Sequence, residues 1–187
     1  MARKGQDSLI GAWPRVVERV PGARLVIVGW GPYARRLALL KRRSPVRDSI
    51  ILTGAVPHDE LPGHVAMGDV FAMPCRTRGG GLDVEGLGIV FLEASATGLP
   101  VIAGTSGGAP ETVEDGVTGD VVDGRDGDAL VAALVRQLSD PALRERMGRA
   151  GRELMGRRWT WPGLVAGLVE AGSHRSEERR VGKECRS

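Results

Sequence analysis

Short apolar segments alternate with amphipathic stretches along most of the chain. The apolar segments, which have the length and composition of buried strands, are 24–28, 50–52, 70–73, 101–103 and 118–122. The stretches with helical periodicity are 7–20, 33–43, 59–67, 90–97, 128–138, 141–155 and 162–170. Strands that alternate with helices in this way are typical of a doubly wound α/β fold. We therefore expect a mostly parallel sheet with helices on both faces.

Two carboxylates with glycines between them form the most informative local pattern. Glu85 and Glu93 stand eight positions apart, and Gly86 and Gly88 precede the helical stretch 90–97. Eight residues are a little over two helical turns, so Glu85 should lie just before the helix and Glu93 on it, along the same side. Glycines allow backbone N–H groups to approach a ligand at the positively polarised helix end. The pattern predicts an anion site suited to a diphosphate that joins a ribose to a sugar.

The stretch 85–93 resembles the donor-binding signature of retaining GT-B glycosyltransferases. Further segments that resemble this family are the basic loop 3–7, the base-binding turn 53–56 and the loop 105–111. The longer stretch 74–89 resembles the actinobacterial phosphatidylinositol mannosyltransferases that use GDP-mannose. The resemblance spans about residues 1–170 and implies the C-terminal, donor-binding, Rossmann-like half of a GT-B fold.

The resemblance also implies roles for single residues. Glu85 would contact the hydroxyls of the sugar and is the expected catalytic residue. The expected donor-binding residues are Lys4 on the diphosphate, Val56 near the base, Glu93 on the ribose, and Gly86, Leu87, Gly88 and Ile89 between the two carboxylates. The implied reaction is retaining transfer of mannose from GDP-mannose to a phosphatidylinositol mannoside-type lipid, without a protein nucleophile, a cofactor or a metal.

Arg76 and Arg78 flank the start of a glycine-rich loop. One interpretation is that they face an anionic phosphoinositide acceptor. The other is that they are solvated arginines on a flexible loop. The sequence leaves both open.

The second hypothesis is a non-catalytic nucleotide- or dinucleotide-binding module, and the stretch 29–34 offers a rival interpretation as a dinucleotide-dependent enzyme. This stretch follows a strand and opens a helix, as a dinucleotide fingerprint does. That fingerprint needs an acidic residue at the end of the next strand, but this strand ends at Thr53 and Gly54, while Asp48 precedes it. Pro32 also removes a backbone donor where phosphate would bind. A structural strand-to-helix turn is the favoured interpretation.

A second pattern, Asp126-Gly-Asp128, resembles the metal-holding carboxylate pair of other glycosyltransferases. Here it precedes a helical stretch, where aspartate commonly caps the helix. His58 and His64 have no cysteine or carboxylate cluster at metal-ligand spacing. We therefore predict a cap at this position and no metal site.

The C-terminal residues 175–187 lack apolar periodicity and resemble a translated sequencing adapter. We expect one domain over 1–170 and an unstructured tail over 171–187. Residues 175–187 hold five basic and three acidic residues, which leaves 21 and 20 in the remainder of the chain. The formal charge of +3 is thus no evidence for nucleic-acid binding.

Without the tail, Cys75 is the one cysteine, which excludes a disulfide framework and suits a reducing cytosol. No apolar run approaches the about 18 residues of a transmembrane helix. We expect a cytoplasmic location with peripheral contact to the inner face of the membrane, where the lipid acceptor lies.

The family places its first, central strand and a whole N-terminal domain before the basic loop 3–7. We therefore expect the sheet to lack that strand and the missing domain to be the chain's partner. The strands 24–28 and 70–73 should then lie about 9–10 Å apart, two strand spacings, with no ladder between them. The chain alone should not transfer sugar.

Overall fold

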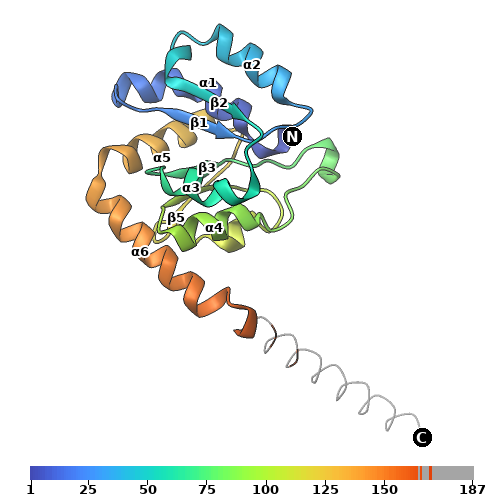
Figure 1. The fold of residues 1–187 in the computed structure, drawn as a ribbon, viewed down its shortest axis with the longest axis vertical. Coiled ribbons are helices and arrows are strands. Elements are labelled where there is room, and N and C mark those ends of the chain that lie inside the picture. Colours follow the sequence, from blue (N-terminus) through green and yellow to red (C-terminus); the bar gives the residue numbers. More distant parts are fainter. Residues whose placement is uncertain (164, 166–168, 170–187) are drawn as a thin grey trace, which may run out of the picture. The chain divides into compact units, whose positions relative to one another are not determined.

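A computed structural model describes residues 1–163, 165 and 169 (Figure 1). The strands are β1 (Leu25–Val28), β2 (Ile50–Gly54), β3 (Phe71–Met73), β4 (Val101–Gly104) and β5 (Gly119–Val122). The α-helices are α1 (Gln6–Arg19), α2 (Ala34–Arg43), α3 (Leu61–Ala66), α4 (Ile89–Thr97), α5 (Gly127–Ser139) and α6 (Pro141–Arg158). The expected strands and the helices up to residue 155 are present, with ends shifted by a few residues.

The predicted helix 59–67 is divided. A 3-10 turn, η3 (His58–Glu60), precedes α3, and Pro62 sits in the first turn of that helix. The proline lacks the N–H that a continuous helix would use, so the α-helix begins only at Leu61. Of the predicted helix 162–170 and tail 171–187, only residues 162, 163, 165 and 169 lie among those described.

The chain divides into two units, Met1–Arg152 and Glu153–Ser187. The first unit contains all five strands and helices α1 to α5, together with the candidate site described below.

The strands form two parallel sheets. β1 pairs with β2, with Leu25 opposite Ile50, and β4 lies between β3 and β5, with Val101 opposite Gly119. Within the described residues no ladder joins β1 to β3, as the sequence led us to expect. The separation of about 9–10 Å stays a prediction.

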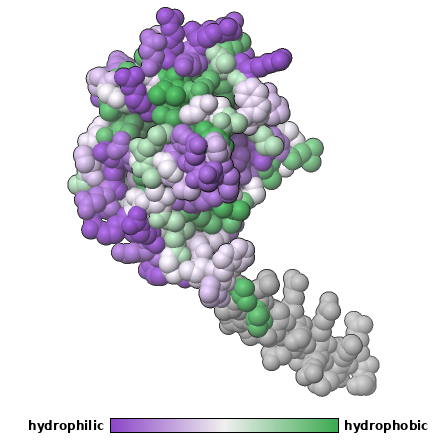
Figure 2. Space-filling view, in the orientation of Figure 1, coloured by the Kyte–Doolittle hydropathy of each residue, from purple (hydrophilic) through white to green (hydrophobic). Residues whose placement is uncertain are grey.

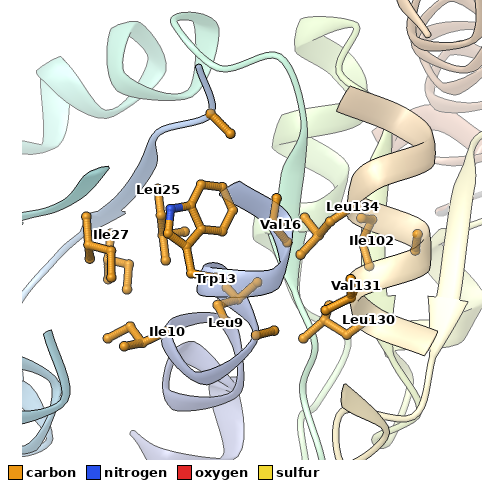
Figure 3. Packing of buried hydrophobic residues seen from close by; sticks show 14 of the residues in the cluster. Leu9, Ile10, Trp13, Val16, Leu25, Ile27, Ile102, Leu130, Val131 and Leu134 are labelled. Carbon is orange, nitrogen blue, oxygen red and sulfur yellow. The ribbon is translucent and has the colours of Figure 1, made fainter. Parts of the chain in front are cut away.

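Although the two sheets are not hydrogen-bonded to each other, they share one hydrophobic core (Figure 3). Helix α1 contributes Leu9, Ile10, Trp13 and Val16, and α5 contributes Leu130, Val131 and Leu134. These side chains cluster with β1 residues Leu25 and Ile27 and with Ile102 of β4. Packing by α1 and α5 thus joins the halves that the backbone leaves separate.

The opposite face of the three-stranded sheet is covered by α4. Side chains alternate along β4, so Ile102 belongs to the first core while Val101 and Ala103 belong to a second. Phe91 of α4 is fully buried in this second core and meets Phe71 edge-to-face, with ring centroids 6.0 Å apart. Helices therefore cover both faces of this parallel sheet, which confirms the doubly wound α/β prediction.

Candidate active site

The side chain of Glu85 lies between two cations. Lys4 Nζ is 3.1 Å from Glu85 Oε2 and 3.2 Å from Oε1, and Arg3 Nε is 3.4 Å from Oε2. Only 7% of the Glu85 side chain is exposed. A nearly buried carboxylate needs such partners, because an unpaired buried charge is costly. The structure thus brings together Lys4 and Glu85, which stand 81 positions apart.

The two cations belong to a 3-10 turn, η1 (Ala2–Lys4), that is fixed to the end of β3. The C=O of Arg3 accepts the N–H of Arg76 at 2.9 Å. Gly5 ends the turn with φ of 75°, and an added Cβ there would overlap the C=O of Pro74. Only glycine fits this combination of left-handed backbone and close approach. Arg3 also contacts Asp83 at 3.2 Å, so it spans two carboxylates.

A second loop fixes the backbone on the other side of Glu85. The N–H of Glu85 donates to Ser106 Oγ at 3.1 Å, and the N–H of Gly108 donates to the C=O of Gly86 at 2.7 Å. Gly107 has φ of 57°, and an added Cβ would overlap the C=O of Glu85. The loop 105–111, which resembles a family segment, therefore positions Glu85.

Helix α4 begins directly after the glycine-rich segment. Gly88 precedes it in the left-handed conformation, with φ of 76°, and no side chain caps the helix. An uncapped N-terminus presents backbone N–H groups and partial positive charge to an anion. Gly86 and Ile89 are exposed here, Leu87 is half-buried and Gly88 is buried. The predicted helix start beside Glu85 is confirmed.

Glu93 and Val56 stand on other parts of the unit. Glu93 is exposed on α4, one turn beyond Ile89. Val56 is half-buried in the loop between β2 and η3, which follows the two-stranded sheet. The side chain of Glu85 pairs with the two cations, whereas Glu93 lies on α4 and Val56 follows β2. A ligand that contacts all three residues would have to extend across both sheets.

Arg76 and Arg78 have different surroundings. Arg76 donates to Asp7 Oδ2 at 2.6 Å and to Ser8 Oγ at 2.7 Å, and its side chain is 14% exposed. The half-exposed side chain of Arg78 lies 3.9 Å from Asp83 Oδ2. Arg76 therefore supports the fold around the site, whereas Arg78 is accessible.

Asp7 was not among the expected site residues, yet it links three segments near the site. It accepts from Arg76 and from Tyr33 Oη, the latter at 3.0 Å. Burial raises the pKa of Asp7, but hydrogen bonds from Arg76 and Tyr33 and the charge of Arg76 outweigh this, so its pKa lies below its ordinary value. Burial and the bond to Asp7 raise the pKa of Tyr33. No local sequence pattern indicates this network.

Asp126 caps α5, as predicted. Its carboxylate accepts the N–H groups of Asp128 and Ala129, each at 2.9 Å. Among residues 1–163, 165 and 169, no cluster of three His, Cys, Asp or Glu side chains is arranged to hold a metal ion. In the same part of the chain, no helix has both the length and the apolar character needed to span a bilayer.

The sequence of this chain is similar to those of known proteins over most of its length. The sequence profile described as "Glycosyl transferases group 1" matches residues 1–154. The GDP-mannose-dependent alpha-(1-6)-phosphatidylinositol monomannoside mannosyltransferase of Mycolicibacterium smegmatis is 54% identical over 96% of this chain and 47% of its own length. The protein of the same name from Mycobacterium tuberculosis is 56% identical over 90% of this chain and 44% of its own length.

The fold agrees with that match. Sucrose-phosphate synthase from Thermosynechococcus elongatus superposes with a TM-score of 0.77 at 29% identity, over 94% of this chain and 44% of that one. The chain thus spans about half the length of these relatives. Its parallel sheets and its carboxylate beside an uncapped helix fit the Rossmann-like half of a GT-B fold. The chain belongs to the group 1 family of glycosyltransferases.

Proposed function

We propose that the chain binds the nucleotide sugar in a retaining mannosyltransferase that uses GDP-mannose. The main support is the geometry of Glu85. Lys4 and Arg3 both contact its carboxylate, and the uncapped N-terminus of α4 lies beside it. The names of relatives that are 54% and 56% identical support mannose as the sugar and guanosine diphosphate as the leaving group.

The diphosphate would lie between Lys4 and the first turn of α4. The ammonium group and the helix dipole both favour negative charge at this place. They would stabilise the charge that develops on the leaving diphosphate as the glycosidic bond breaks. These groups supply positive charge without a metal ion, so we propose metal-independent transfer.

The cation pair allows an exchange of partners. A diphosphate would compete with Glu85 for Lys4, and Arg3 would keep the carboxylate paired when Lys4 turns to the phosphates. Glu85 would then accept hydrogen bonds from the sugar hydroxyls. Glu93 on α4 would hold the ribose, and the backbone at Val56 would lie near the base.

The acceptor would approach on the side of the 76–84 loop. We propose a phosphatidylinositol mannoside-type lipid as the acceptor, as the names of the relatives suggest. We further propose that it is met at the inner membrane face. Arg78 is the accessible cation of this loop and can meet an anionic headgroup, whereas Arg76 would act indirectly by holding the loop to α1. The N-terminal half that the relatives contain would complete the cleft.

A binding screen tests the donor assignment. GDP-mannose, UDP-glucose and ADP-glucose are titrated calorimetrically into the 187-residue chain. The proposal expects GDP-mannose to bind most tightly and free GDP to displace it. Tighter binding of either other sugar nucleotide would overturn the donor assignment, and binding of none would overturn the proposed function.

A further inference from the structure

A cavity of about 370 Å³ lies where β1 and β2 end. The N–H of Gly29 donates to the C=O of Gly54 at 2.9 Å and joins the two strand ends. Apolar side chains of Ile27, Leu37 and Leu52 line the cavity, which is within the size range of small-molecule pockets.

Trp30 is the unusual residue of this cavity. Its side chain lines the wall but is 77% exposed. Figure 2 shows hydrophobic residues exposed at several places on one face. Among the large side chains exposed in the described part of the chain, Trp30 is one of the most exposed. An exposed indole at the mouth of an apolar cavity offers a flat surface on which a planar ring can stack.

The cavity continues toward the candidate active site. Trp30 also lines a neighbouring hollow of about 80 Å³, together with Met1 and Gln6. These two residues flank the turn η1, which contains Lys4. A ligand whose diphosphate contacts Lys4 could therefore extend past Met1 and Gln6 to Trp30.

The polar groups of the cavity indicate the chemistry of a ligand. Arg35 is exposed, lines the cavity and makes no ion pair within residues 1–163, 165 and 169, and no acidic side chain lines the same space. Guanine offers two acceptors, O6 and N7, that arginine binds with both arms, whereas adenine replaces O6 by an amino donor. A planar base with acceptors on its edge fits this combination.

We propose, on the basis of the proposed function, that the donor's base stacks on Trp30 and that Arg35 selects guanine by donating to O6 and N7. Trp30 and Arg35 would then determine base specificity, in addition to the backbone near Val56. The rest of the donor would lead from the cavity past η1 to Glu85.

Calorimetric titration of the 187-residue chain with GDP, ADP and inorganic pyrophosphate tests this inference. Trp30→Ala should weaken GDP binding by about tenfold to a hundredfold and leave pyrophosphate binding unchanged. Trp30→Phe should retain most of the affinity. Trp161→Ala removes another exposed tryptophan, 81% exposed, and serves as the matched control with no effect. Arg35→Met should reduce the preference for GDP over ADP.

The outcomes separate this inference from the proposed function. If Trp30→Ala binds GDP as tightly as the parent chain does, the stacking role is wrong while the proposed function stands. Equal losses for GDP and pyrophosphate would also contradict stacking, because pyrophosphate has no base. If Arg35→Met left the ratio of GDP affinity to ADP affinity unchanged, Arg35 would not be the residue that selects guanine. If the parent chain binds neither GDP nor pyrophosphate, both proposals fail.

Discussion

Arg76 Nη2 lies 2.6 Å from Asp7 Oδ2, and this contact joins the loop after β3 to the first turn of α1. Tyr33, from the turn that leads into α2, bonds to the same carboxylate oxygen. Because α1 precedes β1 and Arg76 follows β3, the network connects segments of the two sheets that no ladder joins. We infer that Asp7 holds the halves of the candidate site in register.

Asp7→Asn should lower the free energy of unfolding by about 1.5–3 kcal/mol at pH 7, since it leaves Arg76 without its charged partner. The pKa of Asp7 is below its ordinary value of 3.8 in the folded chain. Its contribution is therefore complete above that value and is lost as pH falls through the folded-state pKa. Urea unfolding from pH 7 down to pH 3 measures this loss. The free energies of unfolding of the parent and of Asp7→Asn should converge below about pH 4. If the two free energies of unfolding differed by the same amount over this whole range, the Asp7 carboxylate would not be the source of the stability.

Gly107→Ala should displace Glu85, because its Cβ would overlap the C=O of that residue. Gly116→Ala is the matched control, since Gly116 also has positive φ, 75°, but has no atom near an added Cβ. In each variant, an alanine in the left-handed conformation should destabilise the fold by roughly 1–2 kcal/mol. Thermal unfolding should show a larger loss for Gly107→Ala, and calorimetry should show weaker GDP-mannose binding in that variant alone. Identical behaviour of the two variants would be evidence against this positioning role.

Lys4→Met should weaken the binding of GDP and of GDP-mannose to the same extent, since both ligands carry the diphosphate. Loss of one charged hydrogen bond typically costs about 1.5–3 kcal/mol, which is roughly tenfold or more in affinity. Lys41→Met, in the last turn of α2, makes the same change in net charge and should have little effect. The assignment of Lys4 would be wrong if the two substitutions changed the affinity equally in a calorimetric titration.

Removal of residues 175–187 should leave the melting temperature and GDP binding unchanged. The segment lies outside the described residues, and its composition provides too little apolar surface for docking. Differential scanning calorimetry of the full and shortened chains is the direct comparison. A clear drop in melting temperature would show that the tail stabilises the domain, contrary to its interpretation as a translated adapter.

The sequence predicts the parts of the fold that depend on local periodicity. Apolar segments of three to five residues correspond to β1 through β5, and the glycines before residue 89 mark the start of α4. The capping role of Asp126 was also predictable, because an aspartate before a helical stretch usually accepts N–H groups of the first turn.

The contacts that depend on long-range packing were not predictable. Asp7 and Arg76 are 69 positions apart, and neither has a neighbour whose spacing indicates the pair. Lys4 and Glu85 were both expected at the donor, but no local pattern predicts that they also contact each other. The position of Arg3 on Glu85 and Asp83 depends on the turn η1, which is fixed by Pro74 and Arg76.

We propose that Glu85 contacts the sugar of GDP-mannose during transfer. The direct measurement is transfer of labelled mannose from GDP-mannose to phosphatidylinositol monomannoside by a chimera that joins this chain to the N-terminal half of the Mycolicibacterium smegmatis relative. The chimera should transfer mannose, the chain alone should not, and Glu85→Gln in the chimera should lose most transfer while its affinity for GDP changes little. Glu85 does not have this role if Glu85→Gln transfers as well as the parent chimera, or if the variant loses GDP and GDP-mannose affinity equally.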